Sequence, residues 1–222
     1  MTSKRRTQFT GILLFGLLMS DRFVMRKIVS SAPVCTPGSH HCQVLLSDLF
    51  DRAIRLSHYI YSLSSDMFED FEHRYTQDYH TMRSMNGCHT ASLSTPEDKD
   101  QALQIHHAEL MSLVQKLLHS WNQPLQYLAL EGPEDMARRA KEVEEHTKNL
   151  LGGVDRIAGR MQSNLEDDSY PQWFGPIEVR AQNVDPQLLS FYHLLHCFRR
   201  DSNKIDNFLK ILRCRIVHAN NC

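Results

Sequence analysis

The chain has 222 residues, enough for one large domain or two small ones with a sizeable buried core. Its 25 basic and 26 acidic residues give a formal net charge of -1, so it lacks the electrostatic attraction that drives nucleic-acid binding. With only 9 glycines and 8 prolines, the composition also argues against a disordered or fibrous chain.

The N-terminal region predicts export. A basic KRR segment precedes the short apolar run GILLFGLLM, which is typical of a secretory signal peptide and too short to span a bilayer. The small residues of VSSA favour cleavage after residue 31, giving a signal peptide at 1–31 and a mature domain at 32–222. Cleavage after Ser20 and a cytosolic chain with an apolar N-terminal helix are the alternatives. No later segment is apolar enough for membrane insertion, so we expect a secreted protein.

Four long segments show helical periodicity, with apolar residues at steps of three and four. They cover about 44–73, 108–130, 134–161 and 186–218. The apolar row of the first is Leu45, Leu49, Ala53, Leu56, Ile60, Leu63, Met67 and Phe71. Pro124 should kink the second helix because proline removes a backbone donor. Asp185 is a suitable N-cap for the last. No segment alternates with period two, so the expected class is all-α.

The connections between these helices suggest a topology. The short EGPED junction makes the second and third helices antiparallel neighbours. The other two connections are long enough to run back along a helix, which permits parallel pairs. We therefore expect a long-chain four-helix bundle with up-up-down-down cytokine topology and two long crossovers. In the first crossover, STPEDKDQA predicts a short helix with Thr95 as N-cap and Pro96 as its first residue.

The six cysteines are even in number and all follow the signal region, which indicates disulfides. Cys197 and Cys214 cannot pair with each other on one helix, because 17 residues span about 25 Å and a disulfide needs Cα atoms within about 7 Å. Cys35 and Cys42 flank a Pro-Gly turn signal and can close a small loop. The expected pairs are Cys35–Cys42, Cys88–Cys197 and Cys214–Cys222.

No catalytic motif stands out. The sequence has no HExxH, phosphate-binding loop, GxGxxG or GxSxG motif. It has one DFEH where a di-iron bundle needs Glu-x-x-His on two helices. We therefore predict that the protein is not an enzyme and acts by binding a partner.

Several long motifs resemble one hormone family. They are CQVLLSDLFDRAIRLSHYIYSLSSDMF in the first helix, TPEDK in the crossover, SWNQPL in the second helix, EVEEHTKNLLGG in the third and LLHCFRRDSNKIDNFLKILRCRIVHANNC at the end. Through them the chain from Cys35 to Cys222 resembles the prolactin branch of the somatotropin/prolactin hormone family. The early cysteine pair favours this branch over growth hormone. The resemblance implies the same bundle and the same three disulfides.

The resemblance also implies a function. It suggests a monomeric hormone, associated with lactation, that binds two copies of the prolactin receptor extracellular domain, a class I cytokine receptor, and activates JAK/STAT signalling. Two alternatives stay open. One is a diverged placental-lactogen-like or duplicated relative with altered receptor use, and the other is a non-signalling bundle that binds another ligand. No cofactor is implied except weak zinc at His58 and Asp206.

On the last helix a polar row runs beside the core row, through Arg199, Asn203, Asp206, Lys210 and Arg213. For an arbitrary helix this would be a solvated charged face. The resemblance instead implies a first receptor face comprising His58, Lys99, Arg199, Arg200, Asn203, Lys204, Asp206, Phe208 and Lys210. It implies a second face comprising Gln43, Asp48, Arg52 and Gly153. A side chain at Gly153 would block close approach of the second receptor.

Overall fold

The computed structural model describes residues 44–75, 87–162, 169–176, 185–217 and 222. They belong to a compact unit, Pro33–Cys222, and the other unit, Met1–Ala32, lies outside the described residues. The predicted signal peptide, the Cys35–Cys42 pair and Gln43 also fall outside them. The described secondary structure is all helical, as predicted, and no helix in it is long and apolar enough to span a membrane.

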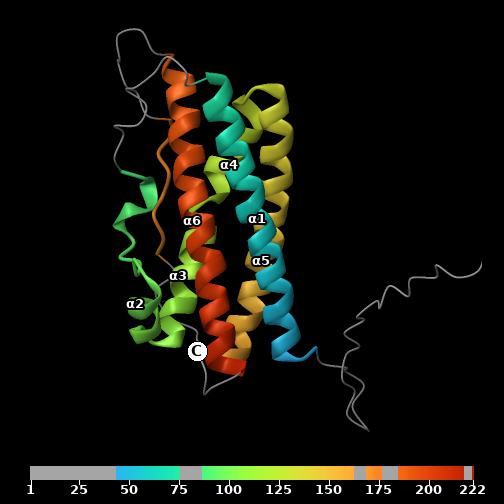
Figure 1. The fold of residues 1–222 in the computed structure, drawn as a ribbon, viewed down its shortest axis with the longest axis vertical. Coiled ribbons are helices and arrows are strands. Elements are labelled where there is room, and N and C mark those ends of the chain that lie inside the picture. Colours follow the sequence, from blue (N-terminus) through green and yellow to red (C-terminus); the bar gives the residue numbers. More distant parts are fainter. Residues whose placement is uncertain (1–43, 76–86, 163–168, 177–184, 218–221) are drawn as a thin grey trace, which may run out of the picture. The chain divides into compact units, whose positions relative to one another are not determined.

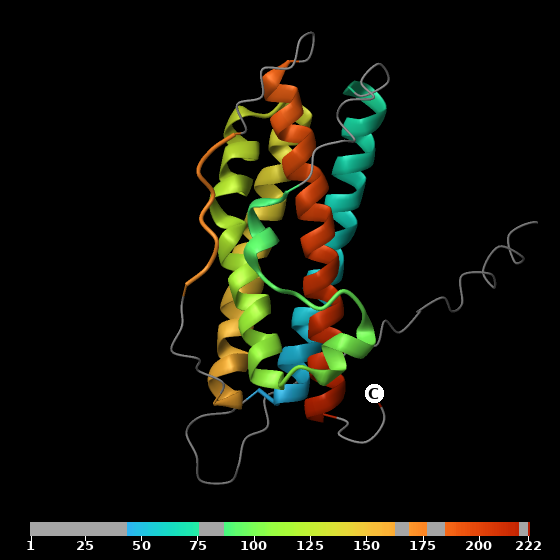
Figure 2. The same ribbon diagram turned by 90° about the vertical axis from the view of Figure 1, so that its left-hand side faces the viewer.

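The elements follow one another in this order: α1 (Leu46–Tyr75), the 3-10 helix η2 (His89–Ser92), α2 (Lys99–Gln104), α3 (His107–Ser120), α4 (Asn122–Glu131), α5 (Glu134–Met161) and α6 (Pro186–Val217). The long helices pack lengthwise in a bundle (Figure 1). α1 packs most extensively on α6 and next on α5, and α3 packs on both α5 and α6. The segment from η2 to α2 lies along α6 (Figure 2).

α1 and α6 run in opposite directions, as their contacts show. Arg213 pairs with Asp51 at 2.6 Å, Ser57 donates to Asp206 at 3.0 Å, and the hydroxyls of Ser64 and Ser202 lie 2.8 Å apart. The residue numbers therefore rise along α1 as they fall along α6.

Two further helix pairs, α1 with α5 and α3 with α6, are also antiparallel by their contacts. Tyr59 of α1 donates to Glu142 of α5, and Arg139 of α5 donates to Asp70 of α1. Gln115 of α3 donates to Asp155 of α5, and the indole of Trp121, which ends α3, donates to Asp201 of α6. Together with the Arg215 bond to the carbonyl of Ile105, this last contact also makes α3 antiparallel to α6.

Large apolar side chains fill the centre of the bundle. The largest fully buried ones are Trp121, Phe50, Phe191, Phe198, Leu110, Met111, Leu117, Leu125, Leu128, Leu150 and Ile157. Each contributes about 1.5–3 kcal/mol of burial free energy. The buried face of α1 contains Ser57 and Ser64, whereas Leu45 of the predicted row is 49% exposed. Each serine hydroxyl lies within hydrogen-bond distance of a main-chain carbonyl three residues earlier and of a polar side chain on α6, so burial leaves it satisfied.

Two local predictions need correction, and a third is confirmed. Asp98 caps α2 by accepting from the amide of Gln101, so Thr95 is not the cap and the helix begins after Pro96. The predicted second helix is two helices that meet at Trp121, three residues before Pro124. Proline at that position cannot donate to the preceding turn, which explains the break. Asp185 caps α6 as predicted, accepting from the amide of Gln187 at 2.8 Å.

Both predicted disulfides whose cysteines lie within the described residues are confirmed. Cys88 is bonded to Cys197, and Cys214 is bonded to Cys222. The first bond joins the segment before η2 to α6 across 109 residues, while the second closes a loop of 8. The two bonds hold α6 to the first crossover and to the end of the chain.

Candidate functional site

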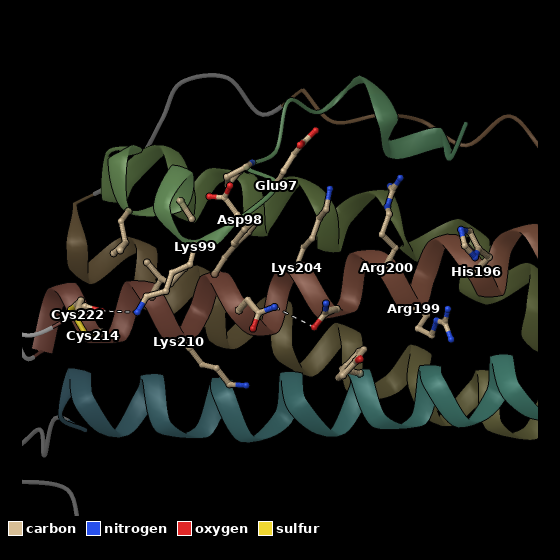
Figure 3. Close-up of a pocket in the computed structure, with 18 residues that line it drawn as sticks. Glu97, Asp98, Lys99, His196, Arg199, Arg200, Lys204, Lys210, Cys214 and Cys222 are labelled. Carbon is tan, nitrogen blue, oxygen red and sulfur yellow. Dashed lines mark hydrogen bonds between the residues drawn. A yellow bond between two sulfur atoms is a disulfide. The ribbon is translucent and has the colours of Figure 1, made fainter. Parts of the chain in front are cut away.

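A groove of about 780 Å³ lies between α6 and the segment that contains α2 (Figure 3). Seven of the nine residues predicted for the first receptor face line it: Lys99, Arg199, Arg200, Asn203, Lys204, Phe208 and Lys210. The other two, His58 and Asp206, do not line the groove. The structure therefore brings together residues from α2 and α6 that lie about a hundred positions apart in the sequence.

The groove has apolar walls and a charged rim, in which five basic residues outnumber the two acidic ones, Glu97 and Asp98. On α6, Lys204, Phe208, Ile211 and Cys214 follow one another at steps of four and three, so they form a single stripe along the helix. Ala102 and Leu103 of α2 line the groove as well, and so does the Cys214–Cys222 disulfide. Figure 3 shows the Lys204 and Arg200 side chains extending from α6 toward the segment before α2.

Lys204 is a half-buried cation of this rim. Its ammonium donates to the Thr95 hydroxyl at 2.6 Å. Burial, and then the nearby Arg200 guanidinium, lower the Lys204 pKa, while Asp201 and Glu97 oppose the shift. Lys99, by contrast, is exposed and donates to the main-chain oxygen of Cys222 at 2.8 Å.

Asp201 organises the groove from beneath, although the sequence analysis did not identify it. Its side chain is 1% exposed, and it accepts from Thr90 of η2 at 2.6 Å and from the indole of Trp121 at 3.0 Å. Arg200 donates its Nε to the same carboxylate at 2.8 Å and a terminal nitrogen to Thr90. One buried carboxylate thus holds η2, the α3–α4 junction and a groove arginine together.

Helical phase could have identified Asp201. It lies three residues after Phe198 and four before Ile205, both of which are buried. An acidic residue in phase with a core row is expected to be buried, and a buried carboxylate needs several donors. The sequence does not show which residues supply them, because Thr90 and Trp121 are 111 and 80 positions away.

Asp206 is also buried, so the polar row predicted on α6 is not one exposed face. Its side chain is 3% exposed and accepts from Ser57 and from Lys210, the latter at 2.6 Å as predicted for this pair. His58 lies on the outer side, with its Nδ1 3.5 Å from Asp206 Oδ2. These two residues supply two ligands where zinc sites in proteins use three or four, so the described residues do not fit a tight zinc site.

Arg199 extends to the other side of α6. Its guanidinium carbon lies 4.2 Å from the centre of the Phe68 ring of α1, which is a cation–π contact. Arg199 and Arg200 are consecutive and therefore point about 100° apart around the helix. The first packs on α1 and the second on the crossover.

Three histidines surround the Cys88–Cys197 bond and the turn of α6 next to it. His89 stacks edge-on against Trp121, and one of its ring nitrogens lies 3.0 Å from the carbonyl oxygen of Ser120. Burial lowers the pKa of His89, His193 and His196, and it is the main cause in each case. The ligand atoms of Cys88, His193 and Cys197 lie within 4.8 Å of one another, but both sulfurs are committed to the disulfide.

The described residues of the predicted second face lie toward one end of the α1–α5 pair. Val44 accepts a hydrogen bond from Arg160, and Tyr59 donates to Glu142. Asp48 and Arg52 fall between those levels on α1, as Gly153 does on α5. A Cβ atom added to Gly153 would meet nothing within 4 Å, so this position opens outward.

Comparison with known proteins gives one family match. The sequence model described as the Somatotropin hormone family matches residues 17–222. This range includes every described helix and both faces considered above.

Proposed function

The chain belongs to the somatotropin hormone family, and from that premise we propose that it is a secreted hormone of the prolactin branch. Members of the family are hormones that bind class I cytokine receptors and are not enzymes. We propose that this chain binds two copies of the prolactin receptor ectodomain and thereby activates JAK/STAT signalling. It needs no cofactor for this function.

The observation that carries the proposal is the composition of the groove. Residues that resemble the family's first receptor face come from α2 and α6, and seven of them line one groove. Buried Asp201 and the Cys88–Cys197 bond keep η2 and α6 in register. A face that is held in place before binding loses less conformational freedom on association, which favours affinity.

The bundle topology that we propose is the up-up-down-down arrangement of the long-chain cytokines. In support of it, α1 is antiparallel to α5 and α6, and α3 is antiparallel to α6. The two opposite faces that such a topology offers are the groove on α6 and α2 and the open surface around Gly153.

Export is proposed from the sequence, with residues 1–31 as the signal peptide and 32–222 as the hormone. Expression of the full chain in cultured animal cells, followed by N-terminal sequencing of the secreted product, tests this division. A product that begins at Ala32 is expected. One that begins at Asp21 would move the cleavage site to the alternative after Ser20, and retention in the cytosol would contradict export.

The central experiment mixes the refolded mature chain with prolactin receptor ectodomain and measures complex mass by light scattering. We expect one hormone with two receptors. A complex of one hormone with one receptor would mean that the second face does not function and that the protein acts as an antagonist. Absence of binding would favour a diverged relative with another partner.

The variant Lys204→Glu tests, in the same experiment, whether the groove belongs to the first receptor face. Reversing a half-buried charge in the groove should reduce affinity for the first receptor at least about tenfold, since like-charge or unpaired groups at interfaces cost several kcal/mol. Lys148→Glu, on an exposed part of α5, is the matched control and should bind as the wild type does. Equal affinity of both variants would remove the groove from the receptor interface.

A further inference from the structure

Among the cations of the groove on α6, Lys99 is exposed and Arg199 packs on Phe68, whereas a half-buried lysine has no carboxylate partner among the described residues. Lys210 is neutralised by Asp206 and Arg200 by Asp201. Lys204 donates only to the neutral hydroxyl of Thr95, and no ion pair in the described part of the chain joins its ammonium to a carboxylate. Glu97 is near enough to raise the Lys204 pKa but forms no ion pair with it.

This unmatched cation stands at one end of an apolar stripe. Phe208 and Ile211 follow Lys204 on the same side of α6, and the Cys214–Cys222 disulfide lies beyond them. Cys214 lies ten positions after Lys204, which is about 15 Å along the helix. Leu103 and Ala102 of α2 form part of the facing wall. The volume of about 780 Å³ lies within the usual range for small-molecule sites.

The arrangement of donors limits the kind of anion that fits. Recognition of phosphate or of a bidentate carboxylate normally uses a free arginine fork. The Arg200 fork is occupied by Asp201 and Thr90, and Arg199 lies against Phe68. An ammonium group alone acts as a point charge, which suits a single negative charge carried at the end of an apolar body.

We propose that this groove binds an amphipathic monoanion of the fatty-acid class, with its carboxylate on Lys204 and its alkyl chain along Phe208 and Ile211 toward the Cys214–Cys222 disulfide. The ligand carboxylate supplies the negative partner that the Lys204 ammonium lacks, and the alkyl chain covers apolar surface on α6 and α2. This site is a property of the hormone alone and does not depend on the receptor proposed above.

The test is isothermal titration calorimetry of the mature chain, without receptor, using dodecanoate below its micellar concentration. We expect one site with a dissociation constant on the order of 10 µM, given the efficiency usual for ligands of this size. Decanoate should bind about fifteenfold more weakly, because two fewer methylene groups are buried at about 0.8 kcal/mol each. A stoichiometry well above one, or equal affinity for both chain lengths, would overturn the assignment to this groove.

Three comparisons isolate the role of the charge. Lys204→Gln should weaken dodecanoate binding about tenfold or more, whereas Lys204→Arg, which keeps the charge, should restore most of it. Lys148→Gln, in an exposed ion pair on α5, should leave binding unchanged. Far-UV circular dichroism verifies that each variant is folded.

Ligands without the carboxylate complete the test. Dodecanol should bind at least about tenfold more weakly than dodecanoate, because it offers no charge to Lys204. Dodecanol binding as tightly as dodecanoate, or Lys204→Gln binding as tightly as the wild type, would refute the proposed site. Because no receptor is present, neither result bears on the hormone assignment.

Discussion

At the scale of single residues, the buried carboxylate of Asp201 links more elements than any other polar group described above. It accepts from the crossover, from the α3–α4 junction and from its own neighbour on α6. Three donors fix its position, and through them it fixes Arg200 at the groove. Asp201 therefore stabilises the fold and also positions a residue of the candidate receptor face.

Asp201→Asn tests this role. An amide is uncharged and presents an NH2 group to donors, so we expect a loss of about 2–3 kcal/mol in the free energy of unfolding. Urea denaturation provides the value, and a shift in tryptophan fluorescence should report the altered environment of Trp121. The control Asp100→Asn, on the exposed first turn of α2, should change stability by less than about 0.5 kcal/mol. Equal stability of the two variants would show that the three donors contribute little.

The lowered pKa values of the buried histidines predict how the free energy of unfolding depends on pH. Burial is the main cause of the lowered pKa of His193 in the folded chain, whereas in the unfolded chain its pKa is about 6.5. Below that pH the unfolded chain binds a proton that the folded chain does not, so the free energy of unfolding falls as pH decreases. Above it, both states are neutral and this dependence disappears.

His193→Gln should therefore flatten the dependence between pH 7.5 and 5.5. The difference from the wild type is at most about 1.4 kcal/mol per pH unit, the value for one proton. Urea denaturation at the two pH values measures it, and comparing slopes cancels any constant change in packing. His89, which burial shifts in the same direction, remains in the variant and keeps part of the effect. Identical slopes would mean that His193 titrates alike in both states.

At the scale of elements, the two disulfides that hold α6 should differ in their contribution to stability. The Cys88–Cys197 bond closes 109 residues and the Cys214–Cys222 bond closes 8. Loop-closure entropy then gives about 4–5 kcal/mol for the first and about 2–3 kcal/mol for the second. Replacing each pair by serines and measuring urea denaturation tests the order. A larger loss from the short loop would contradict the entropic account.

The helices show what periodicity can and cannot predict. The bounds of α5 and α6 agree with the sequence because their apolar rows are long and Asp185 gives a clear start signal. The α3–α4 break falls at Trp121, since the predicted effect of Pro124 acts on the turn before it. The prediction that Thr95 caps α2 was wrong because threonine and aspartate are both good N-cap residues, and the sequence offers both Thr95 and Asp98. Asp98 caps the helix, while Thr95 accepts from Lys204.

At the scale of the whole molecule, the class of fold followed from the sequence, and so did two disulfides, and seven of the nine residues predicted for the first receptor face line the groove. Those face residues were predicted from the family resemblance, because nothing in their spacing shows that α2 lies along α6. Asp206 was placed in an exposed row, yet it is buried between α1 and α6. The partner that buries it, Ser57, is 149 positions away, and local patterns cannot show such a contact.

At this scale, a substitution at Gly153 tests whether the second face is needed for one hormone to bind two receptors. Gly153→Arg should fold normally, since the added side chain meets open space and arginine favours helix more than glycine does. We expect its complex to contain one receptor where the wild type binds two, measured by light scattering. Gly159→Arg, also open on α5 but rotated about 120° around the helix, is the matched control. A complex with two receptors for both variants would place the second face elsewhere.

The extensive packing of α1 against α6 has a consequence for how the chain matures. Among the described helices α1 is synthesised first, and α6, on which it packs most extensively, is synthesised last. Until then Phe50, Ile60 and Met67 have no native partner from α6. A nascent chain of this kind exposes apolar surface until α6 has been made, and such surface is prone to aggregation and to chaperone binding. The Cys88–Cys197 bond likewise cannot close until the part of α6 that carries Cys197 has been synthesised.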